Sequence, residues 1–357
     1  MRTYLSNSMA RFLSSDSSVS LIVGIAIVLA LLTSAGFPNP TLPAALVLLG
    51  ACIILKQKQI SALLKQDRLK PYWFWIPYLV ILVSAFIVSF AVIHTDTFLL
   101  FGLLILFGGC YLLAKALGKR IFWAIPPLAL VNSIMLIVSD TGLAYNMHVD
   151  SIIIILGVLF AQNKWRVVLL PLGVAAIVLS GSEEGLFVGG GLTLLWIASK
   201  LCSRQFRQLR VLIVPGLVLI VVCAVISGLG MWDTIQPNLT KERFTNGIDV
   251  LFDKRVNGAS DEWAAWQDSA YTAIGWDYVA NKDSVHNTPL RIAMEIGILG
   301  GLAWLALVLG GIRYTKYKLA FLAILGFSMI DHMFWTWLMP MLWLMLGVGT
   351  RKEERQC

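Results

Sequence analysis

The sequence predicts an all-α, polytopic integral membrane protein with about twelve transmembrane helices. Three observations support this fold class: the composition, the length of the apolar runs, and the alternation of basic and acidic connections. Hydrophobic residues make up 58% of the 357-residue chain and charged residues 13%, with a mean hydropathy of +0.79. A soluble domain carries about 25% charged residues, so this composition indicates a chain that is mostly surrounded by lipid.

The apolar runs predict helices because the backbone must satisfy its own hydrogen bonds in lipid and the runs lack a two-residue alternation. We expect one membrane domain, 1–357, in which 1–230 holds nine helices, 231–288 forms one long external loop, and 289–357 holds three more helices and a tail. The expected helices are 19–36, 41–55, 72–93, 97–117, 121–138, 150–162, 167–181, 185–199, 211–230, 289–312, 319–332 and 334–349.

The basic residues predict the orientation, because Lys and Arg accumulate on the cytoplasmic side of a membrane. Seven short connections and ends hold 22 of the 28 Lys and Arg residues, and the other six all fall between Lys241 and Arg291. Both termini are therefore expected in the cytoplasm and the long loop outside. The basic groups 313–318 and 351–355 should lie on one side, which makes the apolar stretch between them a short hairpin. Because the net charge of +8 is divided among short connections, the sequence gives no support to a nucleic-acid partner.

The five cysteines and four histidines limit the metal and redox chemistry that the sequence can support. No cysteine lies in the external loop and no CxxC spacing occurs, so we expect neither a structural disulfide nor a cysteine metal site. The histidines all fall near the predicted outer face, without the HxxxH spacing of a metal site. Three of them, His94, His148 and His332, have surroundings that fit ordinary interfacial polar residues.

The tenth expected helix opens on the most specific stretch of the chain, which starts at His286. Pro289 suits the first turn of a helix, and Asn287 or Thr288 can cap it. Glu295 lies inside the apolar run, where an ionisable residue is a functional candidate. The alternative is an intrahelical ion pair with Arg291, four residues earlier. The nearby glycines, Gly297, Gly300 and Gly301, most simply permit close helix packing.

The pattern HNxxLxxxxExGxxG over 286–300 resembles the O-antigen ligase and polymerase superfamily, whose motif opens the helix after a large external loop. The twelve-helix topology extends this resemblance across the chain. It implies a bacterial inner-membrane, multi-pass, metal-independent glycosyltransferase without a cofactor. Such an enzyme moves or polymerises an oligosaccharide from undecaprenyl diphosphate onto an acceptor hydroxyl, on a glycan or a lipid, at the periplasmic face. Its partners would be the lipid-linked donor, the acceptor, membrane lipids and other polysaccharide-assembly membrane proteins.

The resemblance also implies roles for residues of the loop and of the tenth helix. His286 matches the family histidine and would act as the base or orient the acceptor, with Asn287 and Glu295 in support. The donor diphosphate needs arginine forks, for which the three external arginines are candidates, although each could equally be a solvated loop charge. These arginines are Arg243, Arg255 and Arg291. Trp263, Trp266 and Trp276 are candidate sugar platforms, or else anchors at the membrane surface.

One turn departs from the family pattern. The family places an arginine in the external turn after the seventh helix, where this chain has Glu183 and Glu184. A carboxylate there would repel a diphosphate, and this weakens the interpretation as a ligase more than the interpretation as a polymerase. Either Arg255 or Arg291 replaces the missing arginine, or the site binds its donor differently.

Two other classes of protein compete with a glycosyltransferase. A twelve-helix transporter or flippase, for lipid-linked or small substrates, fits the number of spans, but the chain shows no repeat of two halves and its ionisable residues gather at the outer face. A structural membrane subunit would leave the motif that starts at His286 without a role. Removal of the His286 imidazole separates a glycosyltransferase from a transporter: glycan transfer should be lost, whereas transport should survive.

Overall fold

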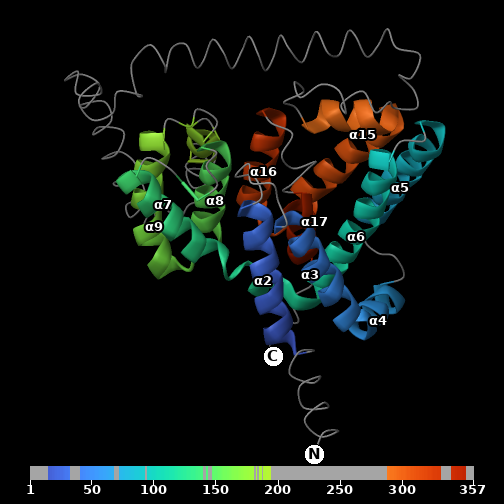
Figure 1. Ribbon diagram of the computed structural model, residues 1–357, viewed down its shortest axis with the longest axis horizontal. Coiled ribbons are helices and arrows are strands. Elements are labelled where there is room, and N and C mark those ends of the chain that lie inside the picture. The colour runs from blue at the N-terminus through green and yellow to red at the C-terminus, as the bar shows by residue number, and fades with distance from the viewer. Residues whose placement is uncertain are drawn as a thin grey trace, which may run out of the picture. The chain divides into compact units, whose positions relative to one another are not determined.

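The computed structural model describes most residues of two stretches, 15–193 and 288–350. Every regular element among the described residues is a helix (Figure 1). The described residues are 15–32, 41–67, 72–92, 95–139, 142–143, 147–180, 182, 185–186, 188–193, 288–330 and 339–350. The elements are α2 (Asp16–Leu32), α3 (Thr41–Leu55), α4 (Gln57–Asp67), α5 (Tyr72–Val92), α6 (Thr95–Leu117), the 3-10 helix η2 (Gly118–Phe122), α7 (Ile125–Ser139), α8 (Met147–Phe160), α9 (Asn163–Ser180), α15 (Thr288–Tyr314), α16 (Lys318–Ile330) and α17 (Met339–Thr350).

Ten of the twelve expected helices coincide with helices of the structure within a few residues. The expected helix 185–199 is described only as far as Thr193, and the expected helix 211–230 lies outside the described residues, as does the loop 231–287. The basic connection after α3 contains a further helix, α4, which the sequence analysis did not predict.

A second correction concerns the start of the fifth expected helix, which we placed at residue 121. Gly118, at φ 73°, ends α6 in the left-handed conformation that glycine adopts most easily. A single 3-10 stretch, η2, follows, and α7 begins only at Ile125, where Pro126 and Pro127 fit the first turn of a helix.

Three described helices are long and apolar enough to cross a membrane: Tyr72–Phe90, Leu100–Phe122 and Thr288–Tyr314. A fourth span results if the bent pair Pro43–Leu55 and Gln57–Lys65 is one span. Five more helices are apolar but shorter, so the described residues support three or four candidate spans. The chain is thus an all-helical membrane protein in the part that the structure describes.

The exposed side of these helices fits a lipid environment. On the second half of α15, Leu299, Leu302, Leu305 and Leu309 are 52–65% exposed and recur every three or four residues. This spacing places them along one face of the helix. A soluble protein rarely exposes a continuous apolar stripe of this kind, whereas a membrane helix turns such a stripe toward the acyl chains.

The helices group into two compact units by their contacts. Unit 1 contains α2 to α6, η2 and α15 to α17, and unit 2 contains α7 to α9 with the described residues that follow α9. The prediction of one membrane domain stays a prediction.

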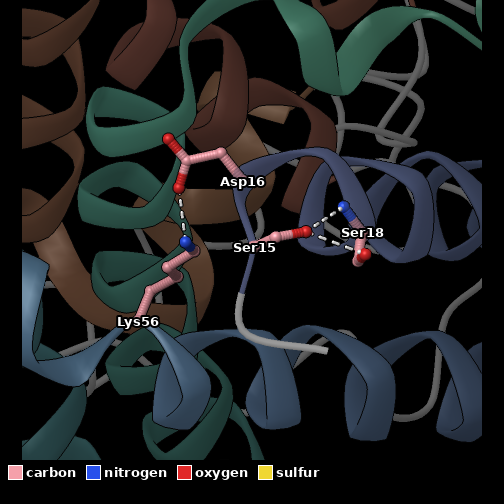
Figure 2. Close-up of polar contacts among 4 residues, drawn as sticks. All are labelled: Ser15, Asp16, Ser18 and Lys56. Atoms are coloured by element: carbon pink, nitrogen blue, oxygen red, sulfur yellow. Dashed lines mark hydrogen bonds and ion pairs between the residues drawn. The ribbon is translucent and has the colours of Figure 1, made fainter. Parts of the chain in front are cut away.

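One end of unit 1 gathers the ends of several helices that are far apart in the sequence. Lys56, between α3 and α4, forms an ion pair with Asp16 in the first turn of α2 (Figure 2). Ser15 caps α2 by accepting a hydrogen bond from the Ser18 backbone N–H at 3.2 Å. The indole N–H of Trp123, just after η2, donates to the Ser20 carbonyl at 3.2 Å.

The remaining helices of unit 1 reach the same end. The Trp73 ring at the start of α5 stacks on the Tyr314 ring at the end of α15, with centroids 5.4 Å apart. The Lys316 N–H, before α16, donates to the carbonyl of Gly349 in the last turn of α17 at 3.2 Å. The pair α16 and α17 therefore returns to the end from which it starts, as the basic groups 313–318 and 351–355 predict.

We call this end of unit 1 the basic end, because nine of the ten described Lys and Arg residues of the unit lie on the helix ends and connections that meet there. Arg291 is the tenth, and it lies on the other end of α15. The nine residues are Lys56, Lys58, Lys65, Lys115, Lys119, Arg120, Arg313, Lys316 and Lys318.

Buried aromatic rings join α5, α6 and α17. The Phe74 and Tyr111 rings stack at 3.5 Å, and Trp343 meets Phe74 edge-on at 5.7 Å. Gly347 allows α17 to approach the backbone of α6 this closely, because a Cβ at that position would lie 2.2 Å from the Tyr111 carbonyl oxygen. Aromatic burial on this scale is a main source of packing energy in a helical bundle.

Candidate active site at the start of helix α15

The helix that carries the sequence motif begins where the sequence predicts. It starts at Thr288, which is fully buried, and Pro289 follows as its second residue. A proline is tolerated there because the first N–H groups of a helix have no partner within the helix. Asn287, the other predicted cap, lies outside the described residues.

Arg291 and Glu295 form the ion pair that the sequence offered as one of two roles for Glu295. The Arg291 Nε lies 2.9 Å from Glu295 Oε1, and the two side chains are 18% and 14% exposed. A pair at this spacing and burial fixes the direction of the guanidinium more firmly than a surface pair does.

The pairing leaves most of the guanidinium for another ligand. Its contact with Glu295 uses Nε alone, and this is the one polar contact that Arg291 makes with the described residues. The two terminal NH₂ groups, which carry four of the five guanidinium protons, can therefore bind oxygens of an anion as a fork.

Helix α15 is broken just after Glu295. Ile296 has φ −122° and ψ 15°, and Gly297 has φ 78° and ψ 173°, both outside the helical region. The Gly297 conformation is one that only glycine adopts readily. Figure 1 shows the result, since α15 (orange) consists of two pieces that run in different directions.

The two pieces of α15 pack against each other across this break. A Cβ on Gly301 would lie 2.9 Å from the Ala293 Cβ and 3.3 Å from its Cα. In a continuous helix, residues eight apart are separated by about 12 Å along the axis, so the contact requires a sharp bend. A Cβ on Gly300 would likewise meet the Ile296 side chain.

This arrangement corrects the expected role of the motif glycines. Gly300 and Gly301 do permit close packing, and the side chains nearest to them belong to α15 itself. Gly297 provides the backbone conformation of the break instead. The sequence pattern ExGxxG contained Gly297 and Gly300, and Gly301 follows it directly, but the pattern did not show that the helix bends here.

Burial orients the first piece of α15 in the unit. Ile292, Met294 and Ile296 are almost completely buried, whereas Arg291 and Glu295 are only partly covered. The second piece runs on for seventeen residues, or about 25 Å, to Tyr314 at the basic end. The described cation Arg291 is therefore far from the basic end, next to the point where the long loop joins α15.

The structure places two of the nine predicted site residues, Arg291 and Glu295, and brings them together. The other seven lie outside the described residues, as do His94, His332, Glu183 and Glu184. Those seven are His286, Asn287, Arg243, Arg255, Trp263, Trp266 and Trp276.

Unit 2 contains a buried polar cluster that the sequence did not single out. The Asn132 side chain on α7 donates to the Asp150 backbone carbonyl at 3.1 Å and accepts from the Leu143 N–H at 2.7 Å. Asp150 is 1% exposed and packs on Gly142, where a Cβ would overlap its carboxylate. Asn132 thus ties the turn before α8 to α8 itself, which explains the cluster as structural. His148, at the start of α8, is partly buried.

Metal ligands do not gather in the part of the chain that the structure describes. No group of three or more His, Cys, Asp or Glu side chains there is placed to hold a metal ion. Cys52 and Cys110, both buried, are free thiols.

Comparisons with known proteins add no family to these observations. No family model matches the chain, and no curated protein matches it significantly.

Proposed function

We propose that this protein is a glycosyltransferase of the O-antigen polymerase or ligase type, which transfers an oligosaccharide from undecaprenyl diphosphate to an acceptor hydroxyl. The observation that supports the proposal most is the state of Arg291. The partly buried Glu295 carboxylate holds its guanidinium by Nε, and neither terminal NH₂ group is bound by a described residue, as bidentate binding of phosphate oxygens requires. This fork lies five residues after the motif histidine, His286.

In this proposal Arg291 binds the donor diphosphate and stabilises the charge that develops as the sugar leaves. Glu295 is a positioning residue, since it acts through Arg291 and does not touch the substrate. His286 takes the proton of the acceptor hydroxyl, and Asn287 helps to orient it. Arg255 and Arg243 complete the diphosphate site, and the three loop tryptophans, Trp263, Trp266 and Trp276, hold the sugars.

The topology that goes with this function has twelve spans in the bacterial inner membrane and both termini in the cytoplasm. The proposal needs the start of α15 at the periplasmic face, because lipid-linked glycans are assembled there. It is supported by the separation of Arg291 from the nine cations of the basic end, since Lys and Arg accumulate on the cytoplasmic side.

We expect reporter enzymes fused after Lys318 and after Arg355 to report the cytoplasm, and a reporter inserted within 246–268 to report the periplasm. The reason is the uneven distribution of Lys and Arg along the chain. A cytoplasmic result for the loop reporter would reverse the orientation and remove every site assignment with it.

The surface glycan of a deletion strain tests the proposed function and separates its two forms. A polymerase is expected to leave single repeat units on the cell surface after deletion, with all long chains lost. A ligase is expected to leave long chains on the lipid carrier, with none on the final acceptor. The missing arginine at Glu183 and Glu184 favours the first result. An unchanged glycan in the deletion strain would overturn the proposal.

We expect Arg291→Ala to lower glycan transfer strongly, because loss of a charge-assisted hydrogen bond costs about 1.5–3 kcal/mol, or roughly 10- to 150-fold. Arg255→Ala should act similarly, and Lys282→Ala, which removes a point charge from the same loop, much less. The amount of long-chain product is measured in cells with matched protein abundance.

Glu295→Gln distinguishes a positioning role from a purely structural one. The amide can still accept a hydrogen bond from Arg291 but carries no charge. We therefore expect a normally abundant protein with a raised donor KM, whereas a merely structural Glu295 would change abundance and leave the KM of the assembled protein alone.

A further inference from the structure

Helix α4 has the features of a helix that lies on a membrane surface. It leaves α3 at a bend of 65° and is eleven residues long, too short to cross a bilayer. Ile60, Leu63 and Leu64 recur at the spacing of one helical face, whereas Lys58 and Lys65, seven residues apart, are both exposed. The helix is thus amphipathic, with two lysines directed away from its apolar side.

The apolar side of α4 is buried against protein in one part and exposed in another. Ile60 is buried, and α4 packs against α6. Leu63 and Leu64 stay partly exposed, and the residues that end α3 just before the bend, Ile54 and Leu55, are 67% and 40% exposed. Exposed apolar side chains at the end of an apolar helix suit an acyl environment, and the bend of 65° after them gives α4 the direction of a helix that follows the interface.

Several exposed cations of the basic end form no ion pair in the part of the protein that the structure describes. Lys58 and Lys65 on α4, and Lys119 and Arg120 on η2, are all exposed and form no ion pair or hydrogen bond with a described side chain. Lys56 differs, because it is buried and paired with Asp16 (Figure 2). The protein thus neutralises the cation at the bend and leaves those facing outward for an anionic partner.

We propose that α4 lies in the membrane interface and binds the headgroups of anionic bilayer phospholipids through Lys58 and Lys65. The complementary charge and the amphipathic spacing support this occupant over a protein partner. The partly exposed leucines need an apolar environment on one side of α4, and the lysines need anions on the opposite side. Lys119 and Arg120 extend the same positive surface. Each cation near an anionic bilayer surface strengthens binding by about 5-fold. This binding is independent of the proposed glycan transfer, whose residues lie at the other end of α15.

The test uses the full-length protein reconstituted in vesicles of phosphatidylglycerol mixed with phosphatidylcholine. The protein is extracted with its bound lipid, and the enrichment of phosphatidylglycerol over the vesicle composition is measured by mass spectrometry. We expect enrichment that falls at high salt, because screening weakens surface electrostatics. The double variant K58Q/K65Q should lower the enrichment by about 5- to 25-fold, and the charge-preserving control K58R/K65R should keep it.

Arg68 and Lys70 keep the connection basic in both variants, so insertion should follow the wild-type topology. Size-exclusion profiles verify that both variants are folded. Wild-type enrichment in K58Q/K65Q would overturn the proposal, as would equal uptake of phosphatidylcholine by the wild type. Binding of inorganic phosphate in detergent, at the affinity of the lipid, would instead assign the surface to a soluble anion and would also overturn it.

Discussion

His286→Ala is expected to abolish glycan transfer while the protein remains inserted and able to bind its lipid-linked donor. General acid–base assistance is typically worth about 10²–10⁴-fold in rate, which is enough to erase long-chain product in cells. In the sequence His286 lies two residues before Thr288, where α15 begins. A neutral imidazole is the form that can take a proton from the acceptor hydroxyl.

The matched controls for this prediction are His94→Ala and His148→Ala, which remove the same side chain from positions outside the motif. Both should retain most of the transfer activity. Long-chain glycan is compared in a deletion strain complemented with each variant, at equal protein abundance. A normally abundant His286→Ala protein that still makes wild-type glycan would exclude a catalytic role, and it is also the result that a transporter would give.

Gly297→Ala is expected to give the second-largest effect, through the shape of α15 rather than through chemistry. At φ 78° and ψ 173° a side chain strains the backbone by about 1–3 kcal/mol, which favours a straighter helix over the bent one by roughly 5- to 150-fold. Straightening separates Ala293 from Gly301 and moves the Arg291 guanidinium away from its present position. We therefore expect a large loss of transfer activity together with a lower thermal stability in detergent.

Gly102→Ala in α6 is the control for Gly297→Ala, because nothing lies within 4 Å of a Cβ at that position. Alanine is the better helix former by about 1 kcal/mol, so this variant should be as stable as the wild type or more stable. If Gly297→Ala retained full stability and activity, α15 would not need its break, and the placement of Arg291 would have to be explained without it.

The sequence alone predicted much of the helical architecture, because apolar runs in lipid have few alternatives to helices. The expected ranges 41–55, 72–93 and 289–312 agree with α3, α5 and α15 to within one or two residues. The return of α17 to the start of α16 followed from charge alone, since both flanking groups are basic. The same reasoning failed at α4, because its apolar residues are too few to stand out from a charged connection.

The candidate site was predicted only as a set of residues in a motif. The spacing of Arg291 and Glu295 allowed an ion pair, and it equally allowed an unpaired functional carboxylate. The tertiary structure decided between them, because partial burial of both side chains favours the paired state. It also decided that Gly297 breaks the helix, since glycine is compatible with both a continuous helix and a bend, and contacts between distant residues select one.

What the sequence by itself determined is therefore local: which segments are helical, where charge gathers, and which residues form the motif that begins at His286. These properties depend on hydropathy, on charge and on neighbours a few residues apart. The tertiary structure decided how distant segments meet, as in the contact of Lys56 with Asp16 and that of Ala293 with Gly301 across the bend. Such contacts depend on packing between surfaces, and the spacing of residues along the chain does not encode them.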